Sequence, residues 1–284
     1  MALVCEHVGV SLQGSSRALL TDVSLSVEAG QVVGVAGRSG AGKSTLLRCL
    51  SGAQLPDVGR VCVDDLELDG ADGCRRTFAE RVALVGQLPE RQLFATSVAE
   101  DVAFGPRQLG LSDDEVAARV EWALARVGLD AVLVGERSPF ALSGGERRRV
   151  AIAGMLALQT PYLLLDEPTA GLDPSERDRL LACVRELAAS GVGVVLVSHD
   201  VETLTKLSDD VLLLDKGVCV AYGSARSVLV DARALAVCGL EMPLAARMAE
   251  RLTERGVDLP AGILTSEELA DALLALHARG GEAS

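Results

Sequence analysis

The sequence predicts an α/β fold built on a mostly parallel sheet that helices cover. Two apolar segments of strand length, residues 162–165 and 193–197, are separated by a helical pattern, and this alternation is typical of a parallel sheet. Hydrophobic residues make up 49% of the 284 residues and aromatic residues only 2%, so Ala, Val, Leu and Ile must build the core. Such residues suit strands that are buried on both faces. This length favours one large domain with an appendage.

The N-terminal part of the sequence predicts short strands around a glycine-rich loop. Within residues 1–35, Val and Leu alternate with polar residues, and Gly30 marks a turn. An apolar strand follows at residues 31–36 and leads through the glycine-rich segment 37–42 into a helix. Further strands are predicted at residues 61–68 and 82–85.

The later part of the sequence adds helices whose ends carry capping residues. Within residues 112–158, Ser112 and Glu115 have the spacing of a capping box, and Gly128 is placed to end that helix. A second helix is predicted to start near Ser143.

After about residue 224 the pattern becomes that of a helical tail. Pro243 is well placed at the start of a helix and Gly256 at its end. Thr265 and Glu268 form another capping box before an apolar helix.

The composition disfavours nucleic acid as the main partner. The net charge is −13, and an acidic surface repels phosphate backbones. The run Glu146–Arg149 is a local basic patch, but it is too short to coat a duplex. Seven cysteines without a Cys-x-x-Cys pair disfavour a zinc or redox site, and with no secretory leader they indicate a reducing cytoplasm. No segment approaches the roughly 20 apolar residues of a bilayer span, so work at a membrane would require a partner.

The segment from Gly37 to Ser44 has the pattern of a phosphate-binding loop between a strand and a helix. Its glycines let backbone N–H groups turn toward phosphate oxygens, and the helix directs its positive end to the same place. Lys43 is expected to reach the β- and γ-phosphates of ATP, Ser44 to bind Mg²⁺, and Thr45 to support the loop. The residues predicted to bind ATP are Gly37, Arg38, Ser39, Gly40, Ala41, Gly42, Lys43, Ser44 and Thr45.

Two acids end the apolar strand at residues 163–165. Buried strand positions do not tolerate carboxylates, so Asp166 and Glu167 are expected at the carboxyl edge of the sheet, where ligands bind in open α/β folds. Asp166 is predicted to hold Mg²⁺ indirectly, and Glu167 to act as the general base that polarises the attacking water.

A second anion site is predicted where Leu142–Glu146 opens a helix. One triphosphate is already surrounded by the first loop, so the economical arrangement is two subunits placed head to tail. Each subunit would then lend this site to the γ-phosphate of the other. The predicted contacts to the partner's ATP are Ser143, Gly144, Gly145 and Glu146.

With these motifs in this order the sequence resembles the ABC ATPase family. Gln87 matches the Q-loop glutamine, Asp173 the D-loop, and His199 the switch histidine. The resemblance implies that Glu167, His199 and Gln87 are catalytic. It also implies that Gln87 belongs to the Mg²⁺ site together with Ser44 and Asp166. Two subunits are then expected to close around two Mg·ATP molecules. Because every catalytic position carries the expected residue, a non-hydrolysing regulator is the least favoured alternative.

The resemblance also implies the architecture. It is a P-loop NTPase fold of the ABC ATPase type, with an N-terminal antiparallel β subdomain and a RecA-like, mostly parallel sheet as its core. The expected ABC ATPase domain covers residues 1–224, with a helical subdomain at about 88–158. Residues 225–284 are then a C-terminal helical tail that helps two ATPases associate.

Residues 87–94 and 98–106 further resemble the energy-coupling-factor group of importers, which take up vitamins or transition-metal ions such as cobalt. This implies a peripheral subunit at the cytoplasmic face of the membrane. Its partners would be a second ABC ATPase, as homodimer or heterodimer, an integral membrane component and a substrate-binding membrane subunit. Leu93 and Phe94 would be exposed for the membrane component, although Phe94 fits the core equally well.

One departure qualifies the resemblance. The family usually stacks an aromatic residue on adenine near residue 13, whereas this segment reads Ser11-Leu12-Gln13-Gly14, so adenine is expected to rest on an aliphatic or amide surface.

The alternative function is a soluble ABC ATPase that acts on nucleic acid or ribosomes. The acidic charge, the single copy of the motifs and the absence of a heptad run between Lys43 and Ser143 disfavour it.

Overall fold

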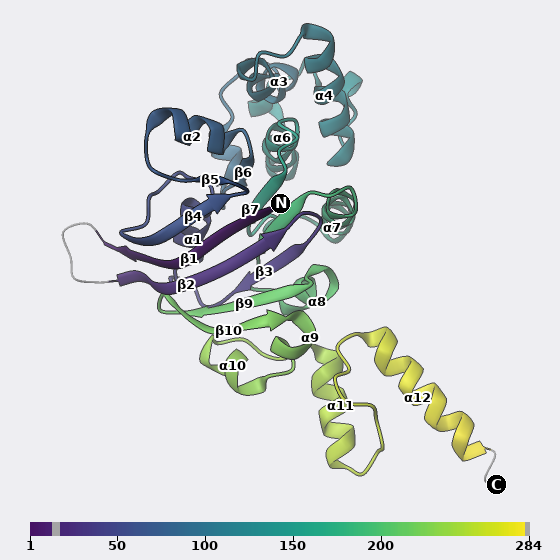
Figure 1. Ribbon diagram of the computed structural model, residues 1–284. Coiled ribbons are helices and arrows are strands. Elements are labelled where there is room, and N and C mark those ends of the chain that lie inside the picture. The colour runs from purple at the N-terminus through teal and green to yellow at the C-terminus, as the bar shows by residue number, and fades with distance from the viewer. Residues whose placement is uncertain (13–17, 282–284) are drawn as a thin grey trace.

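Two sheets, a helical subdomain and a helical tail make up the protein (Figure 1). The computed structural model describes residues 1–12 and 18–281. Within these residues, no helix combines the length and the apolar character that a bilayer span requires.

The smaller sheet is antiparallel and has the order β2-β1-β4-β5. Its strands are β1 (Ala2–Ser11), β2 (Ala18–Glu28), β4 (Val58–Val63) and β5 (Leu66–Glu67). The predicted β-rich N-terminus is confirmed, because alternate residues such as Leu3 and Cys5 are buried. The single strand predicted at residues 61–68 is wrong. Asp64 adopts a left-handed φ of 54°, and the chain turns there so that β4 and β5 pair with each other.

The larger sheet has six strands in the order β10-β9-β3-β8-β7-β6. They are β3 (Val32–Ala36), β6 (Val82–Val85), β7 (Tyr162–Asp166), β8 (Gly193–Val197), β9 (Asp210–Asp215) and β10 (Val218–Ser224). All neighbours pair in parallel except β10, which is antiparallel to β9 at the edge. All residues of β3, β7 and β8 are buried, as the aliphatic composition predicts for a parallel sheet covered on both faces.

Alternate residues of the central strands divide the core into two clusters. Leu164 and Val195 pack with the antiparallel sheet and with α1 (Lys43–Leu50) on one face. Leu163 and Leu165 pack on the other face, against the helical subdomain and the helices around β8. The helices outside the subdomain and the tail are α1, α2 (Asp72–Ala79), α7 (Pro174–Ala189) and α8 (Val201–Leu207). The central sheet is therefore enclosed between two layers, and its carboxyl edge remains free for a site.

The helical subdomain lies at one end of the molecule, around α3, α4 and α6 (Figure 1). Its elements are η1 (Pro89–Gln92), α3 (Val98–Gln108), α4 (Asp113–Arg126), α5 (Ala131–Val134), η2 (Pro139–Ala141) and α6 (Gly144–Leu156). The predicted capping box is confirmed, since Ser112 accepts from the backbone N–H of Glu115 and the Glu115 carboxylate accepts from that of Ser112. Gly128 has a φ of 72° just beyond α4, as a helix C-terminus requires.

The tail comprises α9 (Ala225–Val228), α10 (Ala232–Val237), α11 (Leu244–Glu254) and α12 (Ser266–Gly281). Leu229 and Leu235 belong to the main core, whereas Ala245, Ile263 and Leu269 form a separate small core between α11 and α12. Figure 1 shows α11 and α12 extending from the body of the protein. Both tail predictions are confirmed, because Pro243 directly precedes α11 and Thr265 forms a capping box with Glu268.

A carboxylate of the main body caps α11 of this tail. Glu202 Oε1, on α8, accepts a hydrogen bond of 2.7 Å from the backbone N–H of Leu244, where Pro243 supplies no side-chain cap. A side chain that satisfies a helix N-terminus contributes about 1 kcal/mol. Glu202 therefore links the segment after His199 to the start of α11.

We expect Glu202→Ala to weaken the start of α11 by about 1 kcal/mol, because the Leu244 N–H loses its acceptor. Amide hydrogen exchange at Leu244 should become about fivefold faster, as a local opening free energy lower by that amount implies. Glu202→Gln keeps an acceptor oxygen and should retain most of the protection. Equal exchange rates in Glu202→Ala and the parent would show that this contact does not hold the tail.

Candidate functional site

Three glycines shape the loop between β3 and α1. Gly37, Gly40 and Gly42 have φ values of 152°, 79° and 105°, which are disfavoured for other residues. At Gly37 a Cβ would lie 2.1 Å from the carbonyl oxygen of Leu214, so only glycine fits there. Gly42 supplies no side-chain cap to α1, and the N–H groups of its first turn are available to an anion.

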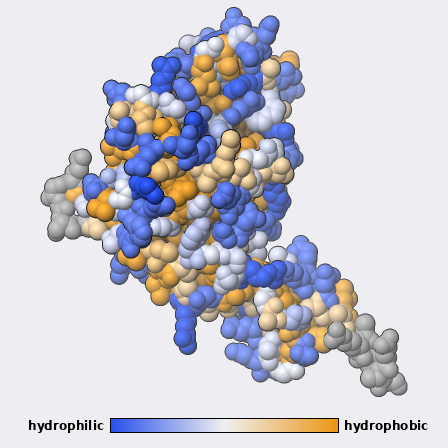
Figure 2. Space-filling view, in the orientation of Figure 1, coloured by the Kyte–Doolittle hydropathy of each residue, from blue (hydrophilic) through white to orange (hydrophobic). Residues whose placement is uncertain are grey.

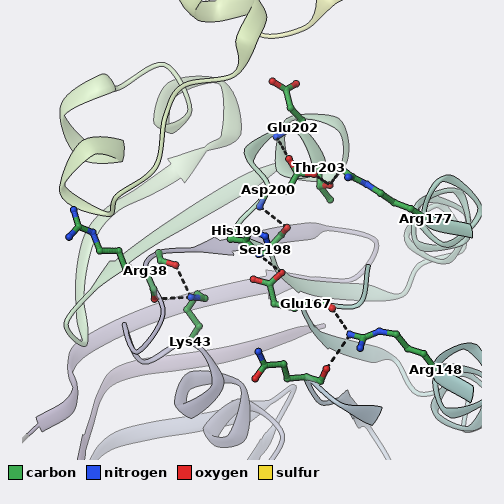
Figure 3. A network of polar contacts seen from close by, with 12 residues as sticks. Arg38, Lys43, Arg148, Glu167, Arg177, Ser198, His199, Asp200, Glu202 and Thr203 are labelled. Carbon is green, nitrogen blue, oxygen red and sulfur yellow. Dashed lines mark hydrogen bonds and ion pairs between the residues drawn. The ribbon is translucent and has the colours of Figure 1, made fainter. Parts of the chain in front are cut away.

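The ammonium group of Lys43 lies inside this loop. Its Nζ donates to the carbonyl oxygens of Gly37 at 2.7 Å and Arg38 at 2.9 Å (Figure 3). Burial lowers the pKa of Lys43, and the nearby carboxylates of Glu167 and Asp166 oppose this shift. Thr45, the next buried side chain of α1, accepts a hydrogen bond from Arg48 at 3.2 Å. The loop thus presents a partly desolvated cation beside a helix N-terminus.

The carboxyl end of β7 meets the start of α1. Ser44 Oγ donates to Asp166 Oδ2 at 2.7 Å, and Asp166 is only 6% exposed. Gln87, which follows β6, faces the same cavity. Hydroxyl, carboxylate and amide oxygens are the hard donors that Mg²⁺ prefers, so these three residues fit that ion.

Glu167 occupies an unusual backbone conformation at the end of β7. Its φ is 51°, and its N–H donates to the carbonyl oxygen of Val197 at 3.1 Å. Its carboxylate lies 2.9 Å from Nδ1 of His199, which follows β8 (Figure 3). The Glu167 side chain is 13% exposed and the His199 side chain 73%. A carboxylate and an imidazole therefore meet at the edge where the two central strands end.

These groups line one cavity of about 620 Å³. It is bounded by Leu12, Leu19, Gly37, Ser39, Gly40, Gly42, Lys43, Ser44, Thr45, Gln87, Asp166, Glu167, Ala170 and His199. The prediction about adenine falls partly outside the described residues, because these exclude Gln13 and Gly14. Among the described residues, Leu12 and Leu19 give that wall an aliphatic surface.

The residues predicted to contact a partner's ATP lie apart from this cavity. Ser143 caps α6 and accepts from the N–H of Glu146 at 3.2 Å, while the Glu146 carboxylate accepts from the N–H of Ser143 at 2.8 Å. These hydrogen bonds lower the pKa of Glu146. Gly144 is exposed, with open space beside its Cα. Asp173 caps α7 in the same manner, accepting from the N–H of Glu176 at 2.8 Å.

The basic run Glu146–Arg149 is not the surface patch that the sequence suggested. Arg148 is 6% exposed and donates to backbone carbonyls. Arg149 pairs with Glu176 at 2.8 Å, and Arg147 donates to the carbonyl oxygen of Leu142 at 3.0 Å. Consecutive residues of a helix point in different directions, and α6 is packed on several sides. That spacing was the signal in the sequence that the three arginines do not share a face.

The adjacent residues Leu93 and Phe94 differ in their burial. Leu93 is buried, so the expectation that it is exposed was wrong, whereas Phe94 is 60% exposed. The ring of Phe94 contacts that of Phe104 edge to face, with centroids 4.9 Å apart. Figure 2 shows hydrophobic surface over α3, the helix that carries Phe104. Only one face of this short segment packs on the core, which leaves Phe94 to solvent.

Comparison with known families gives two matches. The model described as ABC transporter matches residues 20–170. The model described as energy-coupling factor transporter EcfA1 C-terminal domain matches residues 243–279. The second match coincides with α11 and most of α12.

Full-length relatives agree with these matches. The energy-coupling factor transporter ATP-binding protein EcfA2 of Symbiobacterium thermophilum is 44% identical over 254 residues, which cover 89% of this chain and 88% of the relative. The protein named EcfA from Methanothermobacter thermautotrophicus is 39% identical over 264 residues, with 93% and 83% covered.

Solved structures extend the comparison to the fold. CbiO1 of Clostridium perfringens, described as part of the ABC transporter complex cbiONQ, superposes with a TM-score of 0.73 at 29% identity, covering 87% of this chain and 98% of that one. A dimeric ATP-binding cassette in a post-hydrolysis state with ADP and Pi superposes with a TM-score of 0.72 at 25% identity, covering 78% and 98%. The predicted architecture of two sheets and helical parts is therefore confirmed.

Proposed function

The chain belongs to the ATP-binding subunits of energy-coupling factor ABC transporters, and we propose that the cavity at the carboxyl ends of β3, β7 and β8 is where it hydrolyses ATP. As a member of that group it is an ATP-binding, ATP-hydrolysing subunit of an importer. The observation that carries the assignment of the site is the meeting of Lys43, Asp166, Glu167 and His199 in one cavity. The relatives carry transporter names, which leaves the alternative of action on nucleic acid or ribosomes without support.

The loop from Gly37 to Thr45 binds the phosphates in this account. Backbone N–H groups at the start of α1 donate to phosphate oxygens, and the Lys43 ammonium neutralises charge on the β- and γ-phosphates. Lys43 can exchange its bonds to the carbonyls of Gly37 and Arg38 for phosphate oxygens, because all lie within reach of one flexible side chain. Leu12 and Leu19 supply an aliphatic surface for the base.

Ser44, Asp166 and Gln87 are the residues that would hold Mg²⁺. The ion, when bound, neutralises charge on the β- and γ-phosphate oxygens. Asp166 orients the Ser44 hydroxyl through their 2.7 Å hydrogen bond. Gln87 lies two residues before η1, so its side chain connects this site with the helical subdomain.

Glu167 is placed to act as the general base. Its carboxylate lies at the cavity wall, largely shielded from solvent, and accepts a proton from the attacking water. His199 contacts this carboxylate at 2.9 Å and can orient it, and its exposed ring is available to the γ-phosphate of bound ATP. Their origin from adjacent strands β7 and β8 fixes the distance between them.

The complete site requires a second ATP-binding subunit. Ser143, Gly144, Gly145 and Glu146 lie at an exposed helix start outside the chain's own cavity, and Asp173 lies at the start of α7. An exposed N-terminus with open space at Gly144 can receive the γ-phosphate bound by a partner. The partner is a sister ATP-binding subunit or a second copy. The tail from residue 225 onward helps the two associate, and the match of residues 243–279 to a C-terminal domain of the group supports this.

The transporter role places the chain at the cytoplasmic face of the membrane, bound to an integral membrane component. The relative CbiO1 is described as part of the ABC transporter complex cbiONQ. We assign the docking surface to Phe94 and Phe104, whose exposed rings contact each other, and to the exposed Leu88, which follows Gln87 in the chain. The imported substrate is a vitamin or a transition-metal ion, selected by a membrane subunit and not by this chain.

Phe94→Ser tests this surface. The variant should bind the detergent-solubilised membrane component at least tenfold more weakly, because a half-exposed aromatic anchor at an interface is worth about 2 kcal/mol. Its ATP affinity should equal that of the parent, since Phe94 does not line the cavity. Val58→Ser removes an equally exposed apolar side chain from the distant antiparallel sheet and serves as the control. Unchanged binding by Phe94→Ser would place the membrane component elsewhere.

A further inference from the structure

Arg148 of α6 contacts two of the segments that carry the proposed catalytic groups. Its guanidinium donates to the carbonyl oxygens of Glu167 at 2.6 Å, Pro168 at 3.1 Å and Gln87 at 3.2 Å. One planar group thus joins the residues that follow β7 to the residue that follows β6. Figure 3 shows the side chain reaching toward Glu167 from the side opposite His199.

This arrangement is built into the interior of the protein. Arg148 is 6% exposed, and burial lowers the pKa of its guanidinium, although the group stays charged in proteins. A buried guanidinium must have its donors satisfied, and backbone carbonyls of the site provide most of the acceptors. Its fourth neighbour is the Glu90 carboxylate on η1, at 3.6 Å. Glu90 Oε2 has no hydrogen-bond partner within the described residues, so Arg148 is the cation that balances its charge.

The backbone of Glu167 needs such support. A left-handed φ in a residue other than glycine costs about 1–3 kcal/mol and persists only where surrounding contacts impose it. On one side the N–H of Glu167 donates to the carbonyl oxygen of Val197, and on the other its own carbonyl oxygen accepts hydrogen bonds from Arg148 at 2.6 Å and from the N–H of Ala170 at 3.2 Å. Without the shorter bond from Arg148, this carbonyl keeps only the bond within its own turn among the contacts of the described residues, and rotation about the Glu167 backbone would displace the carboxylate.

The direction of the Arg148 side chain argues against a role in nucleotide binding. Arg148 is not among the residues that line the cavity, and its donors end on the carbonyls behind Glu167 and Gln87. We propose that Arg148 is a positioning residue for ATP hydrolysis, which fixes the backbone of Glu167 and Gln87 from α6 and so places the Glu167 carboxylate for the attacking water. This inference rests on the proposed function of the cavity.

Arg148→Lys is the primary test, measured on the full chain with the ATPase partner that co-purifies with it. Lysine keeps the charge beside Glu90, but one ammonium cannot span three carbonyls on two segments. The kcat of ATP hydrolysis should fall about 10- to 100-fold, as displacement of a reacting group by an ångström produces. The KM for ATP should stay within about twofold, because the phosphate contacts are untouched.

Arg148→Ala adds a readout that a purely structural role would not produce. Millimolar guanidinium should restore part of the kcat of this variant by occupying the space that the Arg148 guanidinium vacates. It should leave the kcat of the parent unchanged. Arg119→Ala is the matched control, because Arg119 also donates to two backbone carbonyls, Ala157 and Leu158, but at the far end of α6. It should lower stability without changing kcat.

The outcomes are distinct. A parental kcat in Arg148→Lys, or a loss of activity that follows only the folded fraction with no rescue by guanidinium, would overturn the positioning role. If Arg148→Ala does not fold, Arg148→Lys decides alone. Failure of the proposed function itself would give a different result. The parent would then hydrolyse ATP no faster than Glu167→Gln.

Discussion

Glu167→Gln should bind ATP like the parent and turn it over about 10²- to 10⁴-fold more slowly, the usual contribution of a general base. Glutamine keeps the size of the side chain and can still contact His199, but it cannot accept a proton from water. The contacts to the phosphates and to Mg²⁺ remain. ATP therefore persists between two subunits, and the variant should accumulate as a closed dimer in Mg·ATP. Single-turnover hydrolysis and size-exclusion chromatography measure the two effects.

A matched substitution controls for the loss of one negative charge. Glu186→Gln removes an exposed carboxylate on α7 that pairs with Arg126, away from the cavity. It should retain the parental kcat and should not stabilise the dimer. If Glu167→Gln hydrolysed ATP at the parental rate, Glu167 would not be the base, and the role of its contact with His199 would need another explanation.

Lys43→Ala should lower ATP affinity by two orders of magnitude or more. The ammonium supplies charge-assisted hydrogen bonds worth about 1.5–3 kcal/mol each, and neutralises charge that no other side chain of the loop can balance at the same position. The free protein should remain folded, because burial of this cation is unfavourable, as its lowered pKa shows. Isothermal titration with a non-hydrolysable ATP analogue measures the affinity directly.

Thermal unfolding gives an independent measure of the same effect. At 100 times its Kd, a ligand stabilises the folded state by about 2.7 kcal/mol, so the parent should show a clear upward shift in Tm. Lys43→Ala should show almost none at the same ligand concentration, while Lys206→Ala, on α8, should behave like the parent. An equal nucleotide-dependent shift in Lys43→Ala would refute the assignment of the phosphate loop.

The elements that the sequence predicted best are those set by local chemistry. Strands β6 and β8 have the predicted bounds, since each is an apolar run whose neighbours favour turns. The capping boxes at Ser112 and Thr265 formed because their partners lie three residues away in the chain. In contrast, the turn at Asp64 depends on a left-handed residue between two short apolar stretches, and periodicity does not reveal such a turn.

Tertiary contacts explain what could not be predicted about the site. The order of strands in the larger sheet brings Glu167 beside His199, and no local pattern encodes that pairing. The partners of Arg148 lie 19 to 61 positions away along the chain, so a basic run in the sequence looked like surface. Leu93 and Phe94 are adjacent, and only the packing of the helical subdomain decides which of them is buried. The roles of the site residues remain predictions that the variants above test.

The most direct test of the account is to purify the tagged chain from detergent-solubilised membranes of its host and to identify the proteins bound to it by mass spectrometry. The account predicts recovery with a second ATP-binding subunit, or a second copy of the chain, and with a multi-spanning membrane component that Phe94→Ser no longer retains. Recovery only from the soluble fraction, with ribosomal or DNA-associated proteins, would contradict the transport role and leave only the ATPase chemistry in place.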